Sequence, residues 1–200
     1  FMNPALAARG ILLASWPVRM TNYIVPNYFQ APSFSLVDAV TSATPLAGTA
    51  GTLSFKTLFF GMHAGSIGET SAFLLIVGGL YLVIRRVITP IIPVCFIGTV
   101  ALLSLISGES VMLSVFGGGL ILGAVFMATD YTTSPTTPLG KAIFAVGCGI
   151  ITFVIRKFGS LPEGVSYSIL LMNILVPHIN RFTLSKPFGF EKVKEAAKSE

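Results

Sequence analysis

The segment from Thr41 to Thr44 collects hydroxyl groups and small side chains in a chain that is otherwise largely apolar. Thr44 precedes Pro45, and a residue before proline is disfavoured in the α region, so we expect Thr44 to lie in an extended segment or a turn. Such a turn presents the Thr44 hydroxyl outward, and the small side chains of Ser42 and Ala43 leave room for a bulky group beside the backbone. The alternative is a polar loop whose hydroxyls hydrogen-bond their own backbone.

The overall composition is that of an integral membrane protein. Hydrophobic residues make up 53% of the 200 residues and charged residues 10%, and the mean hydropathy is +0.82. A soluble domain would have about a quarter of its residues charged, and each charge at the bilayer centre costs about 2.5–3.5 kcal/mol. The net charge of +5 therefore reflects loop orientation in a lipid bilayer, and we expect no binding of nucleic acid.

We predict an all-α integral membrane protein, a polytopic helical bundle with about five spans and some broken helices. The five apolar segments are residues 70–84, 87–107, 111–129, 142–155 and 165–180. Only the second and third have the ~20 residues that a full span requires. The others would need flanking turns or burial in protein, and short segments interrupted by glycine or proline are typical of broken helices that line a site.

The chain divides into four parts around these segments. They are residues 1–17, the end or start of an N-terminal helix; 18–69, an outer-side loop with the Thr44 segment; 70–181, the bundle; and 182–200, a cytoplasmic tail. Asn3 can cap the first helix with Pro4 at its first position, and Pro17 ends it. No signal peptide is recognisable at Phe1, so we expect an upstream portion to be missing.

Basic residues in short connections predict the orientation of the bundle. Arg85 and Arg86 place the first connection in the cytoplasm, and five spans leave the lysine-rich C-terminus there as well. Arg156 and Lys157 then fall on the outer side, against the rule. The loop before the first span lies on the outer side, and residues 55–60 are expected to form a short interfacial helix within it.

Metal and disulfide sites are not indicated. Cys95 and Cys148 lie far apart in apolar segments without a C-x-x-C spacing, which favours buried thiols over a disulfide, a zinc site or an iron–sulfur cluster. His63 and His178 have no neighbouring ligands, so we expect no metal site at either residue.

Six segments occur in the same order as similar motifs in the NqrB/RnfD flavoprotein family. They are NPALAAR, TSATPLAG, GSIGETS, GGLYLVIRR, ATDYTTSP and PEGVSYSILLMN, between residue 3 and about residue 174. The second resembles the family's S/T-G-A-T motif, in which the last threonine carries FMN through a phosphoester bond, with Ser42 in place of the glycine. The chain resembles the C-terminal part of the RnfD branch more than the NqrB branch.

This resemblance implies a membrane flavoprotein component of a ferredoxin:NAD⁺ oxidoreductase that couples electron transfer to Na⁺ or H⁺ movement. FMN would be attached covalently at Thr44. The residues expected at this cofactor are Asp38, Thr41, Ser42, Ala43, Thr44 and Glu69. For Glu69 a capping box with Ser66 at the start of the first span is an equal alternative.

The resemblance also implies an architecture and partners. Family members have about ten spans in two inverted repeats, so the five spans here would form the second repeat, and a noncovalent second flavin (riboflavin) could lie with the missing N-terminal half. Ferredoxin and NAD⁺ would bind other subunits, because no G-x-G-x-x-G after a strand and no cysteine cluster occurs here. The partners in the cytoplasmic (inner) membrane would be RnfG, RnfC, RnfA, RnfE and RnfB.

A second candidate site lies in residues 128–138, where an apolar run ends. We favour a site at four of these residues, since their hydroxyl and backbone N–H groups could hold the ring edge of a flavin or a hydrated cation. They are Asp130, Tyr131, Thr132 and Thr133. For residues 136–138 an ordinary loop between helices is the preferred interpretation.

Other functions remain open on the residues alone. One is an NqrB-type subunit of a Na⁺-translocating NADH:quinone reductase. Another is a solute channel or carrier, because the family fold is similar to that of urea-transporter-like proteins. A third is a structural subunit whose motif is vestigial. Thr44 favours the electron carrier, since a pore needs no threonine in such a turn.

Overall fold

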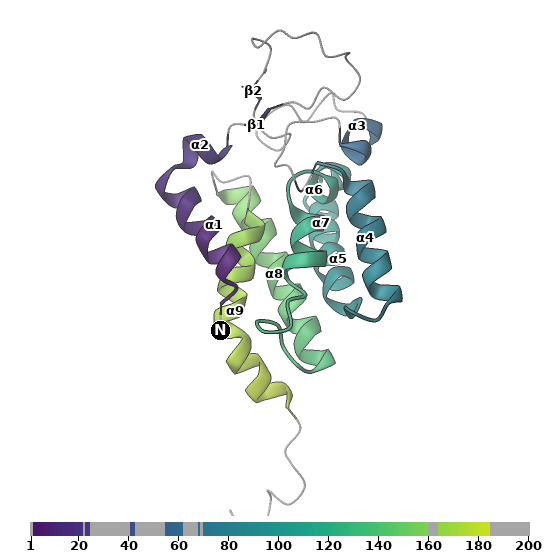
Figure 1. Ribbon diagram of the computed structural model, residues 1–200, viewed down its shortest axis with the longest axis vertical. Coiled ribbons are helices and arrows are strands. Elements are labelled where there is room, and N and C mark those ends of the chain that lie inside the picture. Colours follow the sequence, from purple (N-terminus) through teal and green to yellow (C-terminus); the bar gives the residue numbers. More distant parts are fainter. Residues whose placement is uncertain are drawn as a thin grey trace, which may run out of the picture.

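The computed structural model describes residues 2–21, 23–24, 41–42, 55–61, 68, 70–159 and 164–184. These parts of the chain are predominantly helical, which confirms the predicted helical class (Figure 1). The exception is one antiparallel pair of two-residue strands, β1 (Tyr23–Ile24) and β2 (Thr41–Ser42), in which Tyr23 faces Ser42 and Ile24 faces Thr41. This pair lies beyond one end of the helical bundle, the upper end in Figure 1.

The first helix begins as its sequence predicts. In α1 (Pro4–Ser15) the side-chain oxygen of Asn3 accepts hydrogen bonds from the backbone N–H groups of Ala5 and Leu6, at 3.0 and 3.4 Å. A second short helix, α2 (Pro17–Thr21), follows at once. The prediction of a loop from residue 18 is therefore wrong over this helix, because proline ends one helix but fits the first position of the next.

Aromatic side chains attach the predicted short helix α3 (Phe55–Phe60) to the bundle. Leu58 is buried, and the ring of Phe59 lies 5.7 Å from that of Phe73 and 6.1 Å from that of Phe116, centroid to centroid. Such offset and edge-on ring pairs stabilise a contact beyond the area that they bury. The expectation of a short helix at residues 55–60 is confirmed.

The first two segments of the bundle form α4 (Ala72–Ile84) and α5 (Ile91–Ile106). The start of α4 differs from the predicted capping box, because Ser71 is the N-cap and its hydroxyl accepts a hydrogen bond from the N–H of Leu74 at 3.4 Å. The serine nearest to the first helical residue thus takes the capping role that the sequence assigned to Ser66, which lies outside the described residues.

The third segment is broken, whereas the sequence predicted a full span over residues 111–129. It consists of α6 (Val111–Phe116), α7 (Leu120–Leu122) and a π-helix, η2 (Gly123–Met127). Gly117 is extended, with ψ 138°, and Gly118 has φ 67°, a conformation that glycine adopts without steric strain. The run of three glycines therefore interrupts the helix although the segment is long and apolar enough to span.

The last two segments form the longest helices, which also corrects the predicted lengths. In α8 (Pro138–Phe158) Thr137 caps the N-terminus, and the helix continues through Arg156 and Lys157. Following it, α9 (Gly164–Thr183) contains Pro177. Charged residues end an apolar run but not a helix, so the lengths read from apolar runs were too short. By length and apolar composition, α8 is the one helix in the described part of the chain that could cross a membrane unaided.

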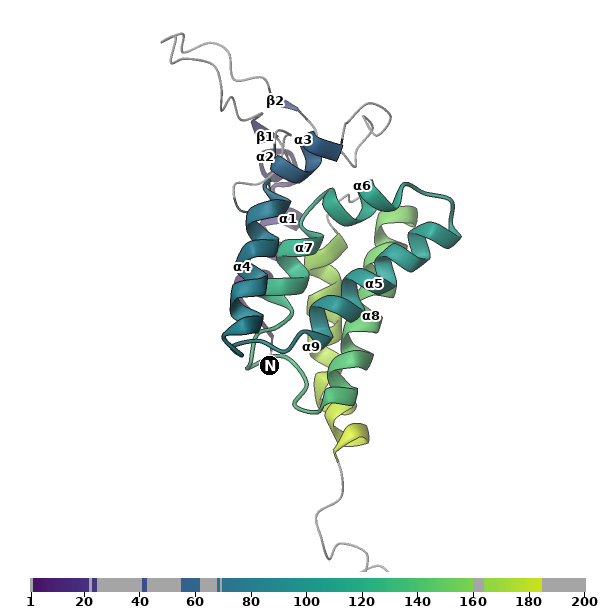
Figure 2. The same cartoon turned by 90° about the vertical axis from the view of Figure 1, so that its right-hand side faces the viewer.

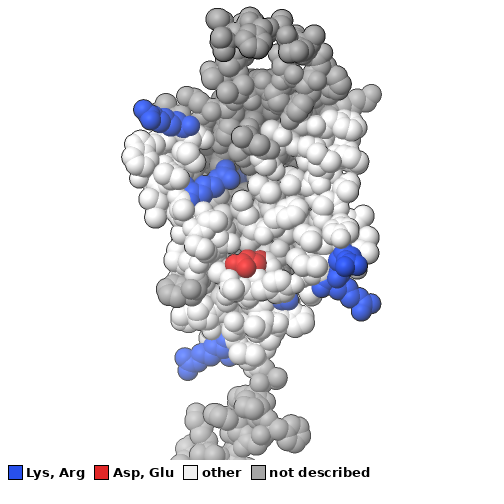
Figure 3. Space-filling view, in the orientation of Figure 1, with Lys and Arg blue, Asp and Glu red and all other residues white. Residues whose placement is uncertain are grey.

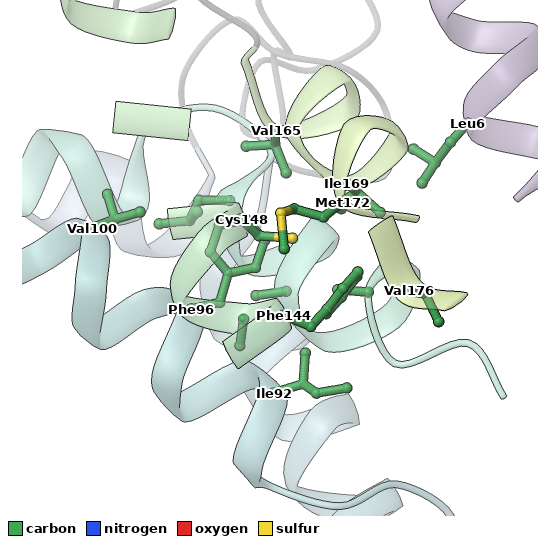
Figure 4. Close-up of a cluster of buried hydrophobic side chains, with 14 residues drawn as sticks. Leu6, Ile92, Phe96, Val100, Phe144, Cys148, Val165, Ile169, Met172 and Val176 are labelled. Atoms are coloured by element: carbon green, nitrogen blue, oxygen red, sulfur yellow. The ribbon is translucent and has the colours of Figure 1, made fainter. Parts of the chain in front are cut away.

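The core lies where α5, α8 and α9 meet (Figure 4). Phe96, Phe144 and Cys148 are fully buried there. Both thiols are free, but only Cys148 is buried as predicted, since Cys95 is partly exposed.

Glycine sets the closest approach of α5 and α8, because a Cβ atom on Gly149 would lie 2.6 Å from the Cβ atom of Thr99. Small residues at such contacts are how helices pack closely in lipid.

The two ends of the bundle carry different segments (Figures 1 and 2). At the upper end lie the strands, α3, the end of α5 and the start of α9. At the lower end lie the turn between α4 and α5, the loop between η2 and α8, and the end of α9. The sequence predicted that the connection with Arg85 and Arg86 and the C-terminal end of the bundle lie on the same side. The arrangement of the helices agrees with this prediction.

Candidate functional site

A cation from α8 occupies the break in the third segment. The guanidinium of Arg156 donates hydrogen bonds to the backbone carbonyl oxygens of Ser114, at 2.6 Å, and Gly117, at 3.4 Å. Both carbonyls lie at the C-terminal end of α6, where helix carbonyl groups lack partners within the helix and the helix dipole is negative. Arg156 therefore satisfies backbone groups that the glycine run leaves open.

A cavity of about 340 Å³ with a mixed polar and apolar lining lies beside this break. Its lining includes Ser104, Glu109, Arg156 and Lys157. The Lys157 ammonium lies 3.8 Å from a carboxylate oxygen of Glu109 and donates to the hydroxyl of Ser107. The hydroxyl of Ser104 is fully buried without a hydrogen-bond partner in the described residues. The cavity thus brings two cations, a carboxylate and serine hydroxyls together with apolar side chains at the upper end of the bundle.

The predicted site at residues 130–133 forms a loop that binds its own carboxylate. The hydroxyls of Thr132 and Thr133 donate to one carboxylate oxygen of Asp130, at 2.8 and 3.2 Å, and the N–H of Thr132 approaches the other oxygen at 3.4 Å. Tyr131 is 73% exposed, whereas Thr133 is buried. These contacts order the loop through its own residues and give the threonine hydroxyls an acceptor. The site expected at residues 130–133 stays a prediction.

The structure does not bring the two groups of predicted site residues together. Thr41 and Ser42 lie on β2 beyond the upper end of the bundle, whereas the loop at residues 130–133 lies at the lower end (Figure 1). The other predicted cofactor residues lie outside the described part of the chain. They are Asp38, Ala43, Thr44 and Glu69. Because the two groups lie at opposite ends of the bundle (Figure 1), we treat residues 130–133 as a candidate site separate from Thr44.

Sequence reasoning missed the polar groups inside the helices. Thr152 on α8 and Ser168 on α9 form a buried hydroxyl pair at 2.7 Å. The side chain of Asn173 is 1% exposed, and neither its nitrogen nor its oxygen has a partner in the described residues. The isolated polar residues in the apolar segments 142–155 and 165–180 could have indicated these contacts, because a polar side chain at membrane depth costs free energy unless it has a partner. The described residues contain no cluster of His, Cys, Asp or Glu that could hold a metal ion.

Comparison with known proteins assigns this arrangement to a family. A model described as the NQR2, RnfD, RnfE family matches residues 1–189. The chain belongs to this family. Its broken third segment and the Arg156 contact are thus features of an NQR2/RnfD/RnfE protein, and the resemblance inferred from the six motifs is confirmed.

Three similar proteins are named as D subunits of oxidoreductase complexes. That of the Na⁺-translocating ferredoxin:NAD⁺ oxidoreductase complex of Acetobacterium woodii is 47% identical, over 100% of this chain and 62% of its own length. The D subunit of the proton-translocating ferredoxin:NAD⁺ oxidoreductase complex of Clostridium ljungdahlii is 44% identical, over 94% of this chain and 61% of its own length. The D subunit of the ion-translocating oxidoreductase complex of Stutzerimonas stutzeri is 35% identical, over 94% of this chain and 63% of its own length. The chain thus spans less than two thirds of the length of these relatives.

Proposed function

We propose that this chain belongs to the membrane-bound D subunit of an ion-translocating ferredoxin:NAD⁺ oxidoreductase and carries electrons through FMN attached at Thr44. The observation that carries the proposal is 47% identity over the whole chain to a relative of that name. The TSATPLAG motif falls within this similarity. The other subunits of the complex would supply the ferredoxin and NAD⁺ sites and would be the partners of this chain.

The attachment site is proposed to lie on the outer side of the cytoplasmic membrane. Bound FMN would supply electron transfer between partner subunits. The chain's own contribution begins with the pairing of β1 and β2, which orders Thr41 and Ser42 two residues before Thr44.

The strand pair and the turn with Arg85 and Arg86 after α4 lie at opposite ends of the antiparallel helices (Figure 1). The assignment of the strand end to the outer side rests on Arg85 and Arg86 in the short connection after α4 and on the lysine-rich C-terminus. Arg19 and Lys56 at the strand end count against it.

The bundle is proposed to cross the membrane several times as the second of two inverted repeats. Charged side chains are few on the face shown in Figure 3, and the blue groups lie mainly toward its two ends. Broken helices such as α6–α7–η2 are tolerated at membrane depth only where protein or a cavity satisfies their backbone. Arg156 supplies hydrogen bonds of this kind. The membrane placement thus agrees with the contacts at the break.

The transported ion is proposed to be Na⁺ or H⁺. The relative from Acetobacterium woodii is named as Na⁺-translocating and that from Clostridium ljungdahlii as proton-translocating, with identities of 47% and 44%. This difference in identity is too small to choose between the ions. Dependence of ion uptake into inverted vesicles on added Na⁺, at fixed pH, distinguishes the two.

The experiment that tests the function is detection of the flavin on the polypeptide. After denaturing electrophoresis the full-length protein from its native host should fluoresce under ultraviolet light, with a mass excess equal to FMN less water. Thr44→Ala should abolish the fluorescence, whereas Thr49→Ala, a threonine of the same segment outside the predicted site, should retain it. Wild-type protein without fluorescence in an active complex would contradict the electron-carrier function and would leave a channel or a structural subunit.

A further inference from the structure

An apolar groove lies between α4 and α5, where the two helices diverge from the turn that joins them (Figure 2). Ile76, Leu80 and Val83 line it from α4, and Val94 and Ile97 line it from α5. Its volume is about 430 Å³, and every lining residue is apolar or glycine. From Ile76 to Val83 the groove follows α4 for about 10 Å, at a rise of 1.5 Å per residue. Its walls would suit a hydrocarbon chain and no polar ligand.

The turn at the lower end of this groove has an arginine in a position typical of glycine. The N–H of Arg86 donates to the carbonyl of Val83, and the N–H of Val87 donates to that of Leu82, both at 2.9 Å. This pattern is a Schellman motif, which usually has glycine at the residue with positive φ. Arg86 has φ 56°, and the other described residues with positive φ are all glycines. A long cationic side chain in a conformation that favours glycine points to a use for that side chain.

Positive charge collects at the same turn. The side chains of Arg85 and Arg86 are exposed, and within the described residues no carboxylate forms an ion pair with either. The ammonium of Lys141, on α8, donates to the hydroxyl of Thr89 at 3.3 Å, which brings a third cation to the turn.

No side chain caps the N-terminus of α5, where the N-cap residue is Pro90. Pro90 and Pro93 have no N–H, so the first turn of α5 offers the N–H groups of Ile91 and Ile92 alone. The cations would therefore supply most of the contacts to a phosphate.

We infer that the groove and the turn together bind an anionic phospholipid of the cytoplasmic leaflet. Its phosphate would contact Arg85, Arg86 and the N-terminus of α5, and one acyl chain would lie in the groove between α4 and α5. Val83 and Pro90 line the groove and flank the turn, so the two parts of the site are continuous. The inference rests on the proposed membrane placement but is independent of the flavin.

The test compares two lipids with the same acyl chains and different charge. The full-length protein in detergent is titrated with dioleoyl phosphatidylglycerol or dioleoyl phosphatidylcholine, and bound lipid is counted by native mass spectrometry. Phosphatidylglycerol should bind more tightly. Arg85→Gln and Arg86→Gln should each weaken its binding about fivefold, the effect of one cation near an anionic surface. Arg181→Gln removes a charge from the end of α9 and should change it less than about twofold.

Two further variants separate lipid binding from a structural role. Arg86→Gly places the usual residue at the positive-φ position, so it should keep or raise Tm while it weakens phosphatidylglycerol binding about fivefold. Leu80→Trp fills the groove and should weaken the binding of both lipids, whereas Leu105→Trp, at an exposed position of α5 outside the groove lining, should not. Glycerol 3-phosphate, which has the anion without the acyl chains, should not compete at equal concentration.

Equal binding of the two lipids to the wild type would overturn the inference, as would an unchanged preference in Arg86→Gly. Absence of bound lipid would also overturn it, since another segment would then fill the groove. Failure of the membrane placement has a separate signature, extraction of the protein from membranes by alkaline carbonate. Loss of flavin fluorescence would affect the proposed electron-carrier function alone.

Discussion

The guanidinium of Arg156 on α8 lies 2.6 Å from the backbone carbonyl oxygen of Ser114 at the end of α6. Counted by its position in the sequence, Arg156 is a loop charge on the wrong side of the membrane. Its contacts give it a different role, because it satisfies the carbonyl groups that a glycine-induced break exposes. An arginine used within the bundle does not bear on orientation, so the charges that conflict with the positive-inside rule are Lys157 and the basic residues of α2 and α3, Arg19 and Lys56 (Figure 1).

Replacing Arg156 should destabilise the bundle at the break. Arg156→Leu removes two hydrogen bonds from a charged group, each worth about 1.5–3 kcal/mol, and leaves buried carbonyls without a donor. We expect a clear fall in Tm of the detergent-solubilised protein. Lys157→Gln is the matched control, because its partly exposed pair with Glu109 is worth only about 0–1 kcal/mol. Equal effects of the two variants would show that the break does not depend on Arg156.

Two glycine-to-alanine changes should act in opposite directions. Gly149→Ala places a Cβ atom 2.6 Å from that of Thr99, so α5 and α8 must separate. The free energy of unfolding should fall by about 1–3 kcal/mol, which lowers Tm. Gly98→Ala, on α5, meets no atom within 4 Å and should raise stability by about 0.5–1 kcal/mol through helix propensity. A stabilising effect of Gly149→Ala would contradict the close contact of α5 with α8.

Asn173→Leu should stabilise the protein. The buried amide has no partner in the described residues, and an unsatisfied buried polar group costs about 1–3 kcal/mol. Pro177, four residues later, also lacks the N–H that would bond the carbonyl of Asn173. Thermal unfolding of the full-length variant measures the effect. A fall in Tm would contradict the prediction and would mean either that Asn173 has a polar partner outside the described residues or that the larger leucine overpacks the site.

Asp130→Ala should leave the covalent flavin in place. It removes three contacts within the loop, so we expect a loss of about 1 kcal/mol in stability, measured as a shift in Tm. The loop lies at the opposite end of the bundle from β2 (Figure 1), so in-gel flavin fluorescence should match the wild type. Loss of the fluorescence with an intact fold would show that the loop acts on the attachment site.

The sequence was sufficient for the features that depend on local chemistry. Apolar composition predicted the helical class, Asn3 with Pro4 predicted the start of α1, and residues 55–60 form the expected short helix. Long motifs were sufficient for the family, which the match over residues 1–189 confirms. These features need only neighbouring residues, because caps and motifs are set within one or two turns of the chain.

Only the tertiary structure decided where helices break and which charges are internal. The apolar run of residues 111–129 fits a full span by length, but the helix ends at Gly117 and Gly118. The backbone carbonyls left without a helical partner accept hydrogen bonds from Arg156, 39 to 42 residues away in the sequence. The lengths of α8 and α9 exceed their apolar runs because charges at helix ends remain helical. Hydropathy measures the solvent around a segment, whereas the hydrogen-bond partners of a broken backbone come from other segments and are fixed only when the helices pack.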